Sequence, residues 1–334
     1  MKTHILLGMA AVFDLLSLTS VSAAIITVDN KYPYAGDYQT LFDAHSAASP
    51  GDTIVVYPSV VPYGAITITK QLIFYGVGFD ITENFGEPYT PTSTIAGNMV
   101  FETGSQGAWL EGFDGDFGVD INTNNIIIKR NDLSFVYVAN GSGSVVTQNN
   151  IVGRGPSIGY SSKYSIYSTQ SSNILISNNI IINPGGSLSY DHGIQVSSST
   201  IINNIIKAPA YSFSGSNNEV VNNIIILGSI VSDNLYRYNI CHNHQLPAIY
   251  GNQNNVDMTT VFVDMANQDF HLSSNSPAAG TGENGTDIGI YGGDAPYVDG
   301  GFPGLPSILQ ILAPTVGSQQ SGLNIQFKAK SNKE

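Results

Sequence analysis

The amino-acid sequence predicts an all-β protein, a right-handed parallel β-helix of about ten coils with an N-terminal capping helix. Three observations lead to this fold class. Of the 334 residues, 42% are hydrophobic and only 11% are charged, so helices built on Glu and Lys are expected to be scarce. The 37 Ile and 31 Asn residues favour β-branched strands separated by turns, because Asn tolerates the left-handed backbone conformation. The third observation is an internal repeat.

The repeat consists of two apolar residues, a spacer, an asparagine, a second spacer and a further apolar residue. Its aligned positions are 131, 149, 178, 203, 222, 238 and 254, with spacings of 16 to 29 residues. A motif that persists while its period varies predicts short strands joined by loops of unequal length, stacked in parallel about 4.8 Å apart. We expect Asn149, Asn178, Asn203 and Asn222 to superpose at one corner of successive coils and to form a hydrogen-bonded ladder.

Residues 1–24 are predicted to be a signal peptide. They begin with Lys2, continue with an apolar run and end in the small residues Ala23 and Ala24, which is typical of a secretory leader. No later apolar run reaches the roughly 18 residues that a membrane-spanning helix needs, so the mature chain is expected to be secreted or attached to the cell surface. The lone Cys241 cannot form an internal disulfide.

Residues 25–52 are expected to form an N-terminal cap. A helix beginning at Asp37 would bury one face made of Leu41, Ala44, His45 and Ala48. The turn at 49–52 then leads into the β-helix, which we assign to residues 53–296.

Several motifs carry a resemblance to a known family. The sequences LFDAH at 41–45, SPGDTIVVY at 49–57 and KQLIFYG at 70–76 resemble the opening of the pectate-lyase-like β-helix superfamily. The sequences DFHL at 269–272, SPA at 276–278 and DIGIY at 287–291 are similar to the end of its chondroitinase-B and alginate-lyase branch. The resemblance covers about residues 38–295 and implies the fold, since the superfamily contains polysaccharide lyases, glycoside hydrolases, esterases and non-catalytic adhesins. The branch also implies a catalytic Lys and Arg beside a calcium site, but no stretch of this sequence matches that motif.

Residues 297–334 are expected to be a Gly/Pro linker followed by a tail. Leu323, Ile325 and Phe327 alternate as in a strand, whereas residues 308–312 have the spacing of one helical turn. The triple-Ile runs at 126–128, 180–182 and 224–226 must turn some side chains outward, so they predict an apolar stripe on one flank. We expect the tail to dock on that stripe.

The two longest excursions between repeats predict a functional site. They follow Ile151 and Ile182 on successive coils, so stacking would bring their side chains together. The candidate catalytic residues are Arg154, Lys163, Asp191 and His192, and the candidate ligand-binding residues are Tyr160, Tyr164, Tyr190, Lys207 and Tyr211. Tyrosine rings suit sugars, and Asp, His, Lys and Arg suit acid–base work. The alternative is that residues 191–193 form a polar turn before a strand.

A second candidate is an acidic, Gly-rich stretch at 111–120. Its carboxylates are Glu111, Asp114, Asp116 and Asp120. Such hard oxygen ligands suit Ca²⁺, although the spacing differs from an EF-hand loop. The alternative is a solvated acidic turn.

The charge pattern limits the function. The net charge is −13 and the basic residues are scattered, which works against nucleic acid as a partner. A hydrolase would need paired carboxylates, but Asp132, Asp191 and Asp233 each stand alone in the repeat pattern. We therefore expect a secreted protein that engages a polysaccharide or a cell-surface protein without catalysis. The alternative is a polysaccharide lyase or glycoside hydrolase acting around His192.

Overall fold

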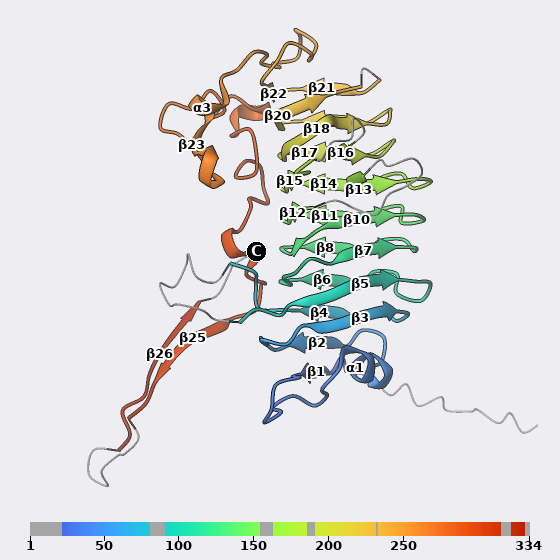
Figure 1. Cartoon of the computed structure of the whole chain (residues 1–334), viewed down its shortest axis with the longest axis vertical. Coiled ribbons are helices and arrows are strands. Elements are labelled where there is room, and N and C mark those ends of the chain that lie inside the picture. Colours follow the sequence, from blue (N-terminus) through green and yellow to red (C-terminus); the bar gives the residue numbers. More distant parts are fainter. Residues whose placement is uncertain are drawn as a thin grey trace, which may run out of the picture.

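The computed structural model describes residues 22–80, 91–153, 163–185, 191–231, 233–314 and 322–330. These residues are mostly β, with two long parallel sheets and few helices, an arrangement compatible with a parallel β-helix. Figure 1 shows the strands stacked in rungs along the longest axis of the molecule. Residues 1–21, which make up most of the expected signal peptide, lie outside the described residues.

The first sheet is a parallel stack of short strands. Within the described residues its order is β1 (Ile25–Val28), β2 (Thr53–Val56), β4 (Ile73–Tyr75), β6 (Trp109–Glu111), β8 (Ile127–Lys129), β11 (Val145–Thr147), β14 (Leu175–Ser177), β17 (Thr200–Ile202), β19 (Glu219–Val221) and β21 (Leu235–Arg237). The central residue of each strand from β2 onward points into the core. This inward row is Ile54, Phe74, Leu110, Ile128, Val146, Ile176, Ile201, Val220 and Tyr236.

The second sheet bends into two faces that are joined by β18 (Ile205–Ser214). One face contains β3 (Tyr63–Ile68), β5 (Ile95–Phe101), β7 (Gly118–Ile121), β10 (Phe135–Val138), β13 (Lys163–Ser168), β16 (Asp191–Gln195) and the second half of β18. The other contains β9 (Asp132–Leu133), β12 (Asn150–Val152), β15 (Ile180–Ile182), the first half of β18, β20 (Ile224–Ser229) and β22 (Ile240–Cys241). Together with the first sheet, these faces enclose one hydrophobic core.

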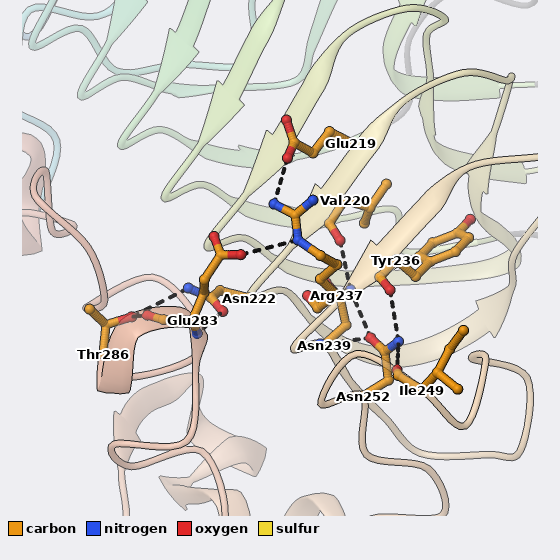
Figure 2. Close-up of polar contacts among 10 residues, drawn as sticks. All are labelled: Glu219, Val220, Asn222, Tyr236, Arg237, Asn239, Ile249, Asn252, Glu283 and Thr286. Atoms are coloured by element: carbon orange, nitrogen blue, oxygen red, sulfur yellow. Dashed lines mark hydrogen bonds and ion pairs between the residues drawn. The ribbon is translucent and has the colours of Figure 1, made fainter.

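An asparagine ladder joins the first sheet to the β9–β22 face. It consists of Asn131, Asn149, Asn179, Asn204, Asn223, Asn239 and Asn252. Each Oδ1 from Asn149 onward accepts the backbone N–H and the side-chain Nδ2–H of the preceding ladder asparagine, at 2.9 to 3.2 Å. Figure 2 shows its last two members, where the Nδ2 groups of Asn239 and Asn252 also donate to backbone carbonyls.

The ladder corrects the predicted register by one residue. Asn149 is equivalent to Asn179, so Asn178, Asn203 and Asn222 occupy the preceding position, which Gln148 fills one coil earlier. That preceding position has positive φ, near 55°, in Gln148, Asn178, Asn203 and Asn222. The sequence motif contains two adjacent asparagines because the two positions have different tasks: one adopts the left-handed turn, and the next one forms the ladder.

Helix α1 (Leu41–Ala47) lies beside the first strands, in contact with β1 and β3. Leu41, Ala44 and His45 are buried, as the sequence predicts. The N-cap is Thr40 rather than Asp37, since the Thr40 side chain accepts the backbone N–H of Asp43. Asp37 instead accepts hydrogen bonds from Thr27.

The predicted apolar stripe exists, but a different segment covers it. Ile180, Ile205, Ile224 and Ile240 pack against a second cluster formed by residues 258–297. We call residues 258–302 the closing segment; it contains α3 (Met258–Val261), β23 (Phe262–Asp264), β24 (Asp269–Leu272) and the 3-10 turns η1 (Met265–Asn267), η2 (Glu283–Gly285) and η3 (Asp299–Gly301). It runs beside the stack in Figure 1. Arg237 connects this segment to the stack, since its guanidinium forms ion pairs with Glu219 of β19 at 2.6 Å and with Glu283 of η2 at 3.1 Å (Figure 2).

The C-terminal tail does not dock on the flank. Residues 307–312 are a strand, β25 (Ser307–Leu312), rather than a helical turn, and they pair in an antiparallel hairpin with β26 (Gln326–Lys330). Leu323, Ile325 and Phe327 are exposed, and Figure 1 shows the hairpin extending away from the stacked strands. The prediction failed because the closing segment already occupies the stripe.

Truncation after Pro306 is therefore expected to leave the fold unchanged. Among the described residues, the two hairpin strands pair only with each other. Removing them should shift the thermal midpoint by less than about 2 °C, since an effect below 1 kcal/mol moves a protein of this size by only a few degrees. Circular dichroism melts of the full chain and the truncated chain check this. A drop well beyond that range would show that the tail contributes to the stability of the body.

Candidate functional site

A stack of aromatic rings crosses four neighbouring strands on the outer face of the β3–β18 half of the second sheet. We call Tyr137, Tyr167, Tyr164, His192 and Tyr211 the aromatic ladder. Their consecutive ring centroids are 5.5, 4.5, 4.6 and 4.9 Å apart, with interplanar angles between 14° and 32°. Three of these contacts join neighbouring strands and one, between Tyr164 and Tyr167, runs along β13; the rings lie face to face, with Tyr164 and His192 tilted by 32°.

Strand register brings these rings together. Tyr137 lies opposite Tyr167, and Tyr164 lies opposite His192, which in turn lies opposite Tyr211. Tyr164 and Tyr167 share one strand, although they are three residues apart.

Both tyrosines are accessible because the alternation of β13 is interrupted between them. Two consecutive buried residues, Ser165 and Ile166, separate them. Gly193 and Ser212, which belong to the neighbouring strands, are also small and buried at this level. A Cβ on Gly193 would lie 2.9 Å from the Ser212 carbonyl oxygen. Small residues at this level therefore allow β13 to present two tyrosines. Tyr167 lies in one row with Tyr137, and Tyr164 lies in a second row with His192 and Tyr211.

His192 is held within the ladder as a structural and hydrogen-bonding group. Its Nδ1 lies 2.9 Å from Oγ of Ser214, and Tyr164 and Tyr211 lie on either side of its ring. Burial lowers the pKa of His192 below its ordinary 6.5, and the nearby Asp191 opposes that shift. Burial therefore favours the neutral imidazole, in which one ring nitrogen donates a hydrogen bond and the other accepts one.

The surroundings of the ladder are polar. Gln195 and Ser214 continue the row of Tyr167 across the next two strands. On the other side, Asp120 lies opposite Tyr137 and accepts a 3.0 Å hydrogen bond from Asn98. Burial raises the pKa of the Asp120 carboxyl. The face therefore combines aromatic edges with amide and hydroxyl groups, which suits a ligand that both donates and accepts hydrogen bonds.

The structure assembles only part of the predicted loop cluster. It brings Tyr164, His192 and Tyr211 together, and it places the backbone of Lys163 opposite Asp191. Lys207 is exposed on the first half of β18, opposite Ile182 and Leu227, and so belongs to the other face. The predicted residues that lie outside the described residues are Arg154, Tyr160 and Tyr190.

Asp191 is buried in a strand instead of lying in an exposed loop. The alternative reading of residues 191–193 as a polar turn is wrong, since Asp191 to Gln195 form β16 and the Asp191 side chain is fully buried. Its carboxylate is thus turned away from solvent, next to the half-buried ladder. Tyr137 and Tyr167 are not indicated by the loop lengths in the sequence; the strand register that places them opposite each other is the signal that identifies them.

The four carboxylates of the acidic stretch at 111–120 have different neighbours and do not form one group. Glu111 is buried and forms a 2.9 Å ion pair with Arg130. Asp114 accepts a hydrogen bond from Thr92, Asp116 accepts one from Ser134, and Asp120 faces the aromatic ladder. Within the part of the chain that the structure describes, no three His, Cys, Asp or Glu side chains are grouped to hold a metal ion.

Asp132 is not electrostatically alone, contrary to the expectation from the repeat. Burial, together with the negative charges of Asp114 and Asp80, raises its pKa to about 7. Its Oδ1 accepts a 3.2 Å hydrogen bond from Asn150. The repeat pattern does not predict the position of Asp80. The closing segment sets it, because the backbone N–H groups of Phe79 and Asp80 both donate to the carbonyl of Gly300.

Comparison of the chain with protein-family models, with curated proteins and with solved structures found no match. Among the described residues, no helix combines the length and the apolar character needed to cross a membrane.

Proposed function

We propose that this chain is a secreted or cell-surface protein with a right-handed parallel β-helix of about ten coils, of the pectate-lyase-like kind. Two long parallel sheets, in which the strands of each face follow one another in chain order, support that architecture. The contacts of α1 with β1 and β3 support its role as the cap of the first coil. The leader-like sequence at 1–24 supports export.

We further propose that the protein binds a polysaccharide along the aromatic ladder without cleaving it. The single observation that carries this proposal is the continuous ring stack across four strands. A rigid row of rings can contact an extended ligand at little cost in conformational entropy, because the rings already hold one another in place.

The chemistry of the face favours a neutral glycan. Because the ring faces contact each other, the ladder presents edges and phenol hydroxyls, beside Gln195 and Ser214. These groups match the alternating donors and acceptors of sugar hydroxyls. Tyr211 is 37% exposed at one end of the ladder, so one sugar ring can also stack there. The net charge of −13 disfavours a polyanionic chain.

Replacing Tyr164 with Ala should weaken glycan binding at least about tenfold. The change removes the ring that joins Tyr167 to His192 and interrupts the ladder at its centre, and losing one aromatic contact of about 1.4 kcal/mol corresponds to that factor. Affinity electrophoresis against neutral and uronate polysaccharides measures the effect. Tyr250→Ala is the matched control, since Tyr250 is exposed outside the ladder.

The same polysaccharide panel tests for catalysis. We expect no new chain ends after prolonged incubation with the unaltered protein. Equal binding by the Tyr164→Ala and control proteins would contradict the ladder as the site. Chain shortening that His192→Ala abolishes, with folding intact, would replace the binding function by a lyase or hydrolase at this face.

A further inference from the structure

A cavity of about 390 Å³ lies between the closing segment and the flank of the strand stack, on a different face from the aromatic ladder. Its volume is within the range of small-molecule sites. Its described lining comes from residues 79–80, from β12 and β15 of the stack, and from the closing segment.

Three carboxylates and one histidine line the cavity. Asp80, Asp269 and Asp299 line it, and no Lys or Arg occurs among its described lining residues. These carboxylates come from three separate segments, so the fold as a whole gathers them. A cavity of this size is far larger than a bare metal ion, and carboxylates distributed around such a space suit a bulkier cation.

Aromatic rings form the remaining wall and hold the carboxylates in place. The ring of His271 stacks on Tyr291 at 4.5 Å and 18°. Nδ1 of His271 lies 2.7 Å from Asp269, and its Nε2 lies 3.6 Å from Asp299. The Tyr291 hydroxyl donates to Asp299 at 2.7 Å. Aromatic faces and carboxylates together are the usual environment for an organic ammonium group.

Asn150 carries a buried side-chain oxygen without a hydrogen-bond partner. It lines the cavity, and its Nδ2 donates to Asp132, but its buried Oδ1 has no hydrogen-bond partner. Leaving such an oxygen unpaired costs about 1–3 kcal/mol. Next to it, burial and the negative charges of Asp114 and Asp80 raise the pKa of Asp132 to about 7, so a cation nearby would favour the charged form of this carboxyl.

We propose that this cavity binds a small organic ammonium ion, either a lysine-like alkylammonium or the ammonium group of an amino sugar. The charge interacts with Asp269, Asp299 and Asp80, and the apolar part of the ligand lies against Phe79, Phe270 and Tyr297. This site does not depend on the aromatic ladder.

Isothermal titration of the full chain with two matched pairs of ligands tests the proposal. The first pair is Nα-acetyl-lysine methylamide and its Nε-acetylated form, and the second is glucosamine and N-acetylglucosamine. We expect one charged ligand of a pair to bind at millimolar concentration, its neutral counterpart to bind at least about tenfold more weakly, and added salt to weaken binding. The pair that responds distinguishes the alkylammonium source from the amino-sugar source.

Asp299→Asn should weaken that binding about tenfold, because it removes one of the charges while keeping an oxygen that accepts from Tyr291. Asp43→Asn is the control, since it removes one exposed charge on α1. If Asp299→Asn does not fold, Asp269→Asn serves the same purpose. The proposal is overturned if neither ammonium ligand binds, if the neutral ligands bind equally well, or if the pocket variant binds as the control does.

Discussion

Replacing Asn204 with Ala is expected to lower the free energy of unfolding by on the order of 5 kcal/mol. The Asn204 side chain makes five hydrogen bonds in the interior. Its Oδ1 accepts from the backbone and the side chain of Asn179, and its Nδ2 donates to Ile176, Ile202 and Asn223. Alanine would leave several of these buried partners unpaired, each at a cost of about 1–3 kcal/mol.

The central position of Asn204 makes the effect large. Both neighbouring rungs lose a ladder contact, and the side chain of Asn204 is buried so that water does not replace it. Urea unfolding followed by circular dichroism measures the loss. Asn98→Ala is the matched control, because Asn98 makes one side-chain hydrogen bond, to Asp120, near the surface. A midpoint for Asn204→Ala within the range of the control would show that the ladder contributes no more than a surface asparagine.

Asp132→Asn is expected to stabilise the protein by up to about 4 kcal/mol at pH 8 and to change little at pH 4. The pKa of Asp132 is raised from 3.8 to about 7 in the folded protein by burial and by the charges of Asp114 and Asp80. The folded state therefore holds its proton more tightly than the unfolded state does. As the pH rises from about 4 through 7, the unfolded state releases the proton more readily, and stability falls.

Asparagine carries no charge at either pH, so it removes this penalty while keeping the shape of the side chain. Thermal midpoints of the two proteins between pH 4 and pH 8 measure the difference. Asp43→Asn, which changes an exposed carboxylate on α1, should show no such divergence. Parallel pH profiles for Asp132→Asn and the unaltered protein would contradict the raised pKa.

The repeat in the sequence was sufficient to predict the stacked parallel strands and an asparagine ladder. It was not sufficient for the register of that ladder, because Asn178 and Asn179 are adjacent and either could be aligned with Asn149. The structure selects Asn179, since the backbone N–H of Asn149 and its Nδ2–H both meet that side chain. A shift of one residue reverses the side of the strand that a residue faces, so local sequence alone could not decide it.

The aromatic site could be predicted only in part. Long excursions pointed to Tyr164, His192 and Tyr211, which do stack together. They also pointed to Lys207, which the bend within β18 places on another face. Tyr137 and Tyr167 lie outside the two long excursions, in β10 and β13, and only the register of those strands places them beside the other rings.

The sequence by itself determined the β-rich composition, the spacing of the strands, the N-terminal helix and the existence of an outward isoleucine stripe. Only the tertiary structure decided what covers that stripe and where the acidic cavity forms. Arg130 contacts the carbonyl of Phe302, and Gln148 contacts that of Pro296, across more than 140 residues of sequence. Strand periodicity depends on neighbours one or two residues away, whereas these contacts depend on how the closing segment returns along the whole stack. For that reason Asp80 and Asp299, which are distant in sequence, line one cavity.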